Sequence, residues 1–215
     1  MLLIKLKKFI FGRPALLQAA KIILTNKYLA NSRFYKGLVM QKARNKVSQM
    51  EEYRHHISIE TVLSCNSRCV FCAHSRKIMT GTMAPELYEK IIDECRDYGI
   101  SHITFGVYGE IMLDKYLFER IEYLRKYGMT YGFISNASLL TPDKTDRLLQ
   151  LGGLTQVQFS VNGFSKEVYE KTMVGLKRDV AYKNILYFLE QKEKLKITDL
   201  QVNISAVKTD INKKD

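Results

Sequence analysis

The spacing of hydrophobic and polar positions changes along the chain and predicts strands that alternate with helices. Residues 56–63 alternate between polar and apolar side chains, which is typical of a strand with one buried face. Residues 85–97 carry apolar side chains three and four positions apart, which predicts an amphipathic helix. We expect further strands at residues 102–105, 131–134, 156–161 and 200–206, and helices from a cap at Asp114 through residue 124 and at residues 142–151, 165–171 and 179–194.

This alternation predicts repeated βαβ units, and hence an α/β fold with a parallel sheet. In a parallel barrel the C-terminal ends of all strands lie on one face, where such folds carry their functional sites. Small or polar residues follow each predicted strand. We therefore expect one functional face that contains Cys65, Cys69 and Cys72, Gly109 and Glu110, Ser135 and Asn136, Ser160 and Asn162, and Lys208 and Thr209.

Three of the four cysteines, Cys65, Cys69 and Cys72, lie within eight residues after the first predicted strand. Thiolates this close can converge on one metal centre, because a short loop closes with little loss of chain entropy. Zinc and four-iron clusters each take four ligands, so three thiolates leave one position open. The candidates for that position are His74, Cys95 and a ligand from outside the protein. Cys95 lies on the apolar face of its helix, which favours a buried, inert thiol.

Basic charge is concentrated at the start of the chain. Residues 1–50 hold 11 Lys and Arg and no Asp or Glu, whereas the remaining residues hold 23 basic and 22 acidic side chains. We therefore expect a basic amphipathic helical extension at residues 1–50 and a core at residues 51–215. The extension either packs on the core or binds an anionic membrane surface or an acidic partner. Nucleic acid is a weaker candidate, since no recognition motif accompanies the charge.

The composition also bears on the compartment. Clustered cysteines in a chain of 215 residues favour a reducing compartment and a metal rather than a framework of disulfides. No uncharged apolar run approaches the ~20 residues that cross a bilayer. The first residues also lack the order of a signal peptide. We expect a cytoplasmic protein that is peripheral at the membrane if the basic extension binds there.

The spacing Cys65-x3-Cys69-x2-Cys72, with Phe71 before the last cysteine, resembles the signature of radical S-adenosylmethionine (radical SAM) enzymes. The resemblance covers most of residues 57–212. Further segments are similar to family motifs: Tyr108-Gly109-Glu110-Ile111 to Gly-Gly-Glu-Pro, Ser135-Asn136-Ala137 to the third-strand Thr-Asn-Gly, and Phe159-Ser160-Val161-Asn162-Gly163 to the fourth-strand Ser-Val-Asp-Gly.

This resemblance implies a partial (β/α) barrel with a defined chemistry. The three cysteines would hold a [4Fe-4S] cluster whose open iron binds S-adenosylmethionine. A flavodoxin or ferredoxin type donor would supply the electron that cleaves it to a 5′-deoxyadenosyl radical, which abstracts hydrogen from a small-molecule, glycan or peptide substrate. The resemblance implies cofactor contacts for Gly109 and Glu110 at the amino group, Phe71 at the adenine, Ser160 and Asn162 at the ribose or methionine, and Ser135 and Asn136 beside them. It implies no separate catalytic side chain.

Compared with the family that it resembles, this sequence lacks some expected elements. Family cores usually have six strands, and many relatives of this subtype add a cysteine-rich, SPASM-like C-terminal domain. Here the strand pattern ends after the fifth strand, so we expect a truncated core with an exposed sheet edge, or one that needs a partner. The alternative is a non-catalytic metal-binding or scaffold protein that binds iron–sulfur or zinc through Cys65, Cys69, Cys72 and His74.

Overall fold

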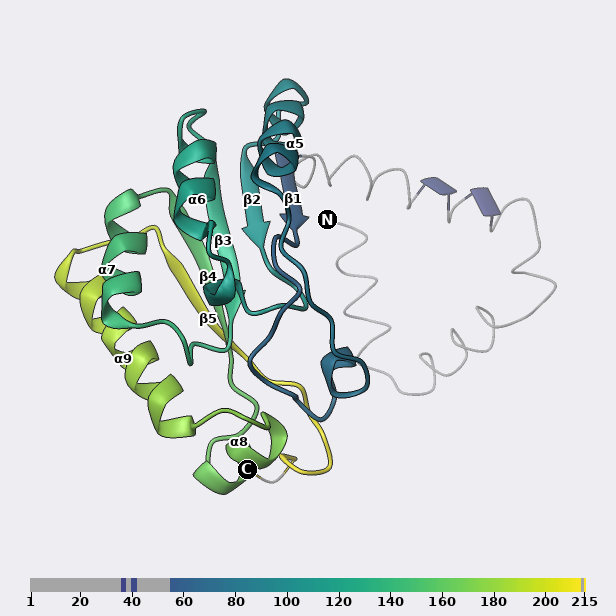
Figure 1. The fold of residues 1–215 in the computed structure, drawn as a ribbon, viewed down its shortest axis with the longest axis vertical. Coiled ribbons are helices and arrows are strands. Elements are labelled where there is room, and N and C mark those ends of the chain that lie inside the picture. Colours follow the sequence, from purple (N-terminus) through teal and green to yellow (C-terminus); the bar gives the residue numbers. More distant parts are fainter. Residues whose placement is uncertain (1–35, 38–39, 42–54, 214) are drawn as a thin grey trace, which may run out of the picture. The chain divides into compact units, whose positions relative to one another are not determined.

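The computed structural model describes residues 36–37, 40–41, 55–213 and 215 (Figure 1). The predicted basic extension therefore lies outside the described residues, apart from four positions. The sheet and its helices belong to one compact unit, Arg54–Asp215. Within the described ranges, no helix is both long and apolar enough to cross a membrane.

The core is a parallel sheet of five strands in the order β1-β2-β3-β4-β5, which confirms the predicted α/β fold (Figure 1). The first strand is shorter than predicted. It ends at Ile59, because Val62 pairs with Thr82 in an antiparallel bridge instead of with the sheet. The strands are β1 His56–Ile59, β2 His102–Phe105, β3 Thr130–Ser135, β4 Leu154–Ser160 and β5 Gln201–Ser205.

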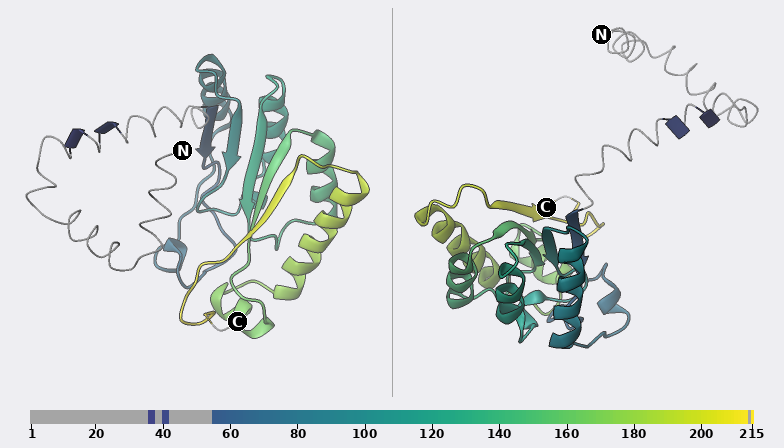
Figure 2. Two further views of the ribbon diagram at one scale, coloured as in Figure 1. Left: turned by 180° about the vertical axis from the view of Figure 1, so that it is seen from behind. Right: turned by 90° about the horizontal axis from the view of Figure 1, so that it is seen from above.

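Helices connect the strands and gather on one side of the sheet (Figure 2). They are α5 Pro85–Asp97, α6 Leu117–Arg125, α7 Pro142–Leu151, α8 Lys166–Thr172 and α9 Arg178–Lys194, with short 3₁₀ turns η2 Ala73–Ser75 and η3 Ile111–Leu113. Pro85 and Pro142 open their helices, where a missing backbone N–H costs nothing. The predicted cap at Asp114 is wrong: Tyr116 precedes α6, and the buried Asp114 carboxylate pairs with Arg120 Nε at 3.2 Å.

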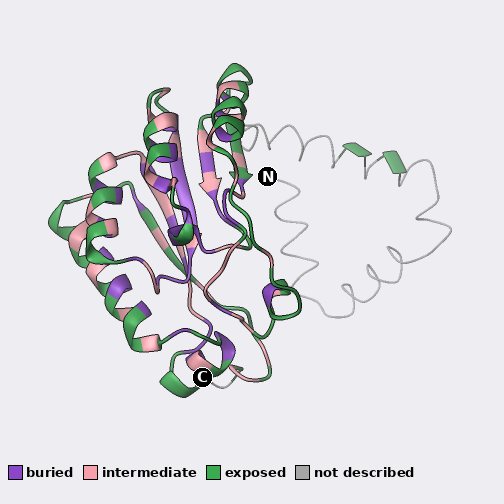
Figure 3. Cartoon of the chain, in the orientation of Figure 1, coloured by how far each residue is buried: buried purple, intermediate pink, exposed green. Residues whose placement is uncertain are grey.

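The two faces of the sheet differ in composition. One face packs against the helices and is apolar, and its central side chains are almost fully buried: Ile59, Ile103, Phe105, Tyr131, Phe133, Val157 and Phe159. The residues between them on β2 and β4 are half-buried, as the alternating colours in Figure 3 show. The helix-covered face supplies the hydrophobic core, so the opposite face is free to carry polar side chains.

Candidate active site

A cavity of about 150 Å³ lies at the C-terminal ends of the strands. It contains all ten residues that the sequence assigned to a cluster or cofactor, so the structure brings them together, while their roles stay predictions. Ser205, the last residue of β5, and Val207 complete the wall, rather than the expected Lys208 and Thr209. The predicted residues that line it are Cys65, Cys69, Phe71, Cys72, Gly109, Glu110, Ser135, Asn136, Ser160 and Asn162.

The cysteine loop after β1 is fixed at two places. At its base, the backbone N–H of Leu63 donates to the carbonyl of Gly81 at 2.9 Å. Further along, the N–H of Arg68 donates to the carbonyl of Val174 at 2.8 Å, and the N–H of Val70 donates to the carbonyl of Thr172 at 3.0 Å. Hydrogen bonds at its base and to the C-terminal end of α8 therefore hold the loop, so the backbone that carries the thiols is fixed.

The three thiols are free and half-buried. Burial raises the pKa of Cys65 from 9.0 to about 11, and the nearby Glu110, Cys69 and Cys72 raise it further by repelling the thiolate. Burial also raises the pKa of Cys69, although the Ser67 hydroxyl at 3.2 Å opposes the shift. Without metal these two thiols stay protonated near neutral pH, so a metal must displace their protons when it binds.

The donor set fits a metal centre with one open position. Three free thiols from one loop line a single cavity and repel one another as thiolates, which bound iron would relieve. In the part of the chain that the structure describes, no three His, Cys, Asp or Glu side chains are already arranged around a metal position. Neither His74, which is buried, nor Cys95, which packs in the core, is among the residues that line the cavity.

Glu110 occupies the centre of the wall after β2. Its carboxylate is buried and accepts hydrogen bonds from the Ser135 hydroxyl at 2.7 Å, the Asn136 backbone N–H at 2.8 Å and the Met112 backbone N–H at 3.2 Å. Burial raises the pKa of Glu110, while these hydrogen bonds and Lys144 oppose the shift. Glu110 thus joins the loop after β2 to the end of β3, which fixes both walls.

Gly109 lies where no other residue fits. A Cβ atom at this position would come within 1.9 Å of the Val62 carbonyl oxygen, because the loop after β2 runs against the start of the cysteine loop. The next residue, Glu110, donates its N–H to the Ser64 carbonyl at 2.9 Å across the same contact. The glycine therefore allows the two loops to touch through their backbones.

Glu60 and Asn66 are functional candidates that the sequence analysis missed. The Glu60 carboxylate accepts from the backbone N–H groups of Tyr108 at 2.8 Å and Gly109 at 3.1 Å. The Asn66 side-chain oxygen Oδ1 accepts from the Asn136 side-chain Nδ2 at 2.9 Å. Glu60 directly follows the first strand and Asn66 directly follows Cys65, and these positions were the available signal. They connect the cysteine loop to the loops after β2 and β3.

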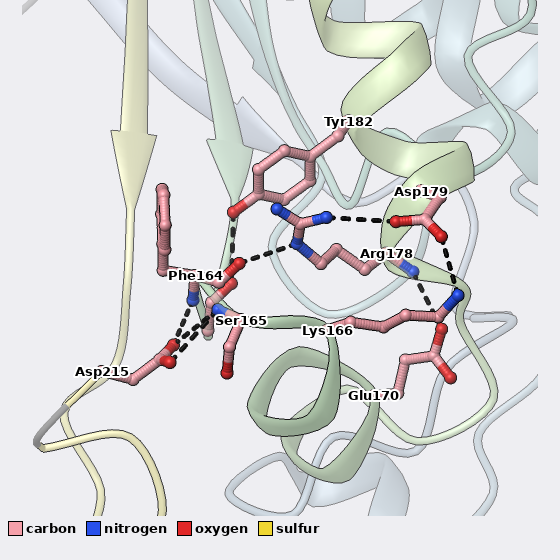
Figure 4. A network of polar contacts seen from close by, with 9 residues as sticks. Phe164, Ser165, Lys166, Glu170, Arg178, Asp179, Tyr182 and Asp215 are labelled. Carbon is pink, nitrogen blue, oxygen red and sulfur yellow. Dashed lines mark hydrogen bonds and ion pairs between the residues drawn. The ribbon is translucent and has the colours of Figure 1, made fainter.

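The loop between β4 and α8 is held from outside the cavity (Figure 4). The Asp215 carboxylate accepts from the Phe164 backbone N–H, and Arg178 donates to the Phe164 carbonyl at 2.7 Å. Inside, the Asn162 side-chain oxygen accepts from the Val207 N–H at 2.7 Å. This network fixes the direction in which Asn162 leaves β4, and it joins the last two strand ends.

Fold and cavity together define an α/β protein with a thiol-lined pocket at the ends of its parallel strands. A model of the radical SAM superfamily matches residues 59–202, and the chain belongs to that superfamily. An uncharacterized protein of Methanocaldococcus jannaschii is 28% identical over 123 residues, which are 57% of this chain and 39% of the relative. A tungsten-containing aldehyde ferredoxin oxidoreductase cofactor-modifying protein of Pyrococcus furiosus is 24% identical over 161 residues, 74% of this chain and 45% of the relative.

Solved structures share the fold. SuiB of Streptococcus suis bound to precursor peptide SuiA has a TM-score of 0.59 at 18% identity, covering 83% of this chain and 39% of that one. BtrN in complex with AdoMet and 2-DOIA has a TM-score of 0.54 at 20% identity, covering 70% and 56%. The chain spans less than half the length of the curated relatives it matches. The parallel sheet thus matches the partial barrel of radical SAM enzymes.

Proposed function

We propose that this chain carries the S-adenosylmethionine cleavage site of a radical SAM enzyme. Cys65, Cys69 and Cys72 would bind three irons of a [4Fe-4S] cluster. When bound, the cluster supplies the electron that cleaves S-adenosylmethionine to methionine and a 5′-deoxyadenosyl radical, which takes a hydrogen atom from the substrate. The observation that supports this proposal is the shared cavity, where the thiols meet the polar residues of four other strand ends.

Glu110 would accept a hydrogen bond from the ammonium of S-adenosylmethionine. An ionised carboxylate offers about four acceptor sites. Oε1 accepts from Ser135 and Met112, whereas Oε2 accepts only from Asn136. Oε2 thus keeps an acceptor site. Because the carboxylate is already oriented by the protein, little reorganisation is needed when the ammonium binds.

Ser135 and Asn136 would act as positioning residues. The Ser135 hydroxyl donates to Glu110 and accepts from the Ala137 N–H at 2.9 Å, so both functions are occupied. The Asn136 side-chain oxygen accepts from the Ser138 hydroxyl, and the Asn136 side-chain NH₂ donates to Asn66 in the cysteine loop. Ser160 and Asn162 would meet the ribose or methionine, and the partly exposed Phe71 would cover the adenine at the mouth of the cavity.

The electron would come from a separate donor of the flavodoxin or ferredoxin type. The sequence has four cysteines, and the fourth, Cys95, is 7% exposed within the core. The described cavity also has exposed apolar side chains in its lining, Phe71, Val107 and Tyr108, where a donor could approach. Rapid reduction of the cluster by a reduced flavodoxin, compared with the same donor after Tyr108→Glu, tests this docking surface.

Residues 1–50 would place the protein at an anionic membrane surface, because they carry 11 basic side chains and no acidic one. Deletion of these residues should abolish sedimentation with vesicles that contain anionic lipid. Binding to neutral vesicles is the control. Unchanged binding after the deletion would remove the membrane from the proposal.

Anaerobic reconstitution with iron and sulfide tests the cleavage site. The wild-type protein should become brown, bind about four irons and release 5′-deoxyadenosine from S-adenosylmethionine under reduction. Cys69→Ala should lose both the cluster and the release. Cys95→Ala is the matched control and should keep both, because Cys95 packs in the core and does not line the cavity. A stably bound zinc without cofactor cleavage would contradict the proposal and favour the metal-binding alternative.

A further inference from the structure

The sheet face opposite the helices has an unusual composition. No Asp, Glu, Lys or Arg occurs in any of the five described strands. Where the helix-covered face has Ile, Phe and Val, the opposite face has Ser, Thr, Gln, Asn and His. A polar surface without a single charged side chain in its strands can form many hydrogen bonds but offers no ion pair.

A second cavity of about 190 Å³ lies on this face. Ile134 lines both this cavity and the cysteine-lined one, so the two adjoin. At about 30 Å³ for each water, the second cavity has room for roughly six waters. That volume suits one ring with its substituents. The other residues that line this cavity are His56, Ser58, Thr104, Gly132, Phe133, Gln156 and Gln158.

Four amide side chains form a patch on β4 and β5. The register pairs Gln156 with Gln201 and Gln158 with Asn203, so the four lie in two adjacent rows. Among the hydrogen bonds of the described residues, none involves the side chains of Gln156, Gln158 or Asn203. Each amide carries two donors and an acceptor, and neighbouring strands are about 4.8 Å apart. The patch therefore offers a two-dimensional array of available donors and acceptors.

The two histidines on this face are held by hydrogen bonds to threonine hydroxyls. His56 Nε2 and the Thr104 hydroxyl lie 2.6 Å apart, and His102 Nδ1 and the Thr130 hydroxyl lie 2.8 Å apart. Burial and the neighbouring His56 lower the pKa of His102, so its ring stays neutral near pH 7. These hydrogen bonds fix both rings, of which His56 lines the cavity.

We propose that this face binds a neutral polyhydroxylated ring of the sugar type as the substrate whose hydrogen is abstracted. This inference rests on the proposed function, because it places the ring beside the S-adenosylmethionine cavity. Ring hydroxyls both donate and accept, as the amides of Gln156 and Gln158 do. A peptide fits less well, because peptides are read through strand edges and apolar side-chain pockets, whereas Ile134 is the main aliphatic side chain here.

Binding of defined sugars to the reconstituted protein with S-adenosylmethionine, without reductant, tests the substrate class. The probes are glucose, galactose, mannose and N-acetylglucosamine, with glucose 6-phosphate and glucuronate as charged counterparts and a capped trialanine as the peptide. At least one neutral sugar should bind saturably and more tightly than both charged probes and the peptide. Gln158→Leu should weaken this binding about tenfold, because two hydrogen bonds are lost.

Gln150→Leu, which removes an exposed amide on α7, should leave the binding unchanged. The inference is overturned if no neutral sugar binds, if a charged sugar or the peptide binds best, or if Gln158→Leu binds the sugar as wild type does. Release of 5′-deoxyadenosine under reduction, measured on the same samples without sugar, separates the two proposals. If release persists while no sugar binds, only the substrate class fails; if the cluster and the release are both absent, the proposed function itself fails.

Discussion

The two halves of the cysteine-lined cavity differ in how their polar atoms are satisfied. Around Glu110, the protein provides its own partners, since three donors surround one buried carboxylate. Around Cys65, Cys69 and Cys72, the thiols are free, and burial holds the pKa of the first two above the ordinary value. The carboxylate half is complete as folded, whereas the thiol half has ligand atoms that still carry protons.

This difference has a physical basis. A buried carboxylate without donors would cost several kcal/mol, so the fold must satisfy it before any cofactor arrives. A protonated thiol is only weakly polar and can be buried empty at little cost. Substitutions in the carboxylate half should therefore reduce the stability of the metal-free protein, whereas those in the thiol half should remove function and leave stability nearly unchanged.

Gly109→Ala should have the largest effect on stability. The added Cβ would meet the Val62 carbonyl at 1.9 Å, and neither backbone can yield without separating the two loops. We expect a loss of about 3 kcal/mol in the free energy of unfolding, measured by urea denaturation of the metal-free protein. Gly128→Ala is the control, because its Cβ meets nothing within 4 Å but its φ is +70°. It should cost only about 1 kcal/mol, and equal losses would contradict the steric explanation.

Glu110→Gln should follow, with a loss of about 1–3 kcal/mol. The new amide NH₂ cannot accept a hydrogen bond, so one of the two backbone donors, Met112 N–H or Asn136 N–H, loses its partner inside the core. Glu119→Gln on the exposed side of α6 is the matched control and should stay within about 0.5 kcal/mol of wild type.

A comparison of Glu110→Gln with wild type also tests how the affinity for S-adenosylmethionine depends on pH. Burial raises the pKa of Glu110, so a falling pH protonates this carboxylate earlier than an exposed one. The affinity for S-adenosylmethionine should therefore fall as the pH falls through that pKa, and Glu110→Gln should bind weakly without this dependence. Calorimetry on the reconstituted protein measures both. The same pH dependence in the Gln variant would show that another group causes it.

Asn136→Ala should have a smaller effect. It removes the hydrogen bond of 2.9 Å to Asn66 and the acceptor for Ser138, while the backbone bond from residue 136 to Glu110 remains. We expect about 1 kcal/mol of destabilisation and a cysteine loop that exchanges its amide protons faster. Hydrogen exchange at residues 65–72 measures this change. Unchanged exchange would show that the remaining contacts of the loop hold it without the Asn136 side chain.

The sequence predicted much of the fold because its hydrophobic periodicity and its helix-starting prolines agree with the tertiary structure. The prediction for α5 was residue for residue correct, since Pro85 opens it and its apolar face is clear. Asp114 was misjudged, because a capping residue and a buried ion-pair partner look alike in sequence. Ile204 alternates as a core residue would, yet it is 63% exposed beside an apolar groove at the edge of the sheet.

Of the candidate site, the sequence could predict only the residues that meet because the ends of the strands converge. The ten residues meet because parallel strands end on one face, which alternation and motif order already imply. The hydrogen bonds from the loop after β2 to Glu60 and from Asn136 to Asn66 depend on loop backbones, whose course no periodicity encodes. For that reason the sequence found the ten residues in the cavity but missed Glu60 and Asn66, which help to hold its walls together.

In the thiol half, Cys65 should titrate at a raised pKa while the fold persists. At pH 8, a thiol of pKa about 11 is ionised in roughly one part per thousand, against about one in ten at 9.0, so alkylation by iodoacetamide should be about 100-fold slower than in the unfolded chain. Because the folded-state pKa is the higher one, this thiol stabilises the metal-free protein below pH 9 and loses that contribution as the pH rises towards 11. Iron binding, which releases the proton, should strengthen over the same range. Mass spectrometry of residues 60–77 follows the reaction, and equal rates in the folded and unfolded chains would show that burial does not protect Cys65 and that the two halves do not differ as described.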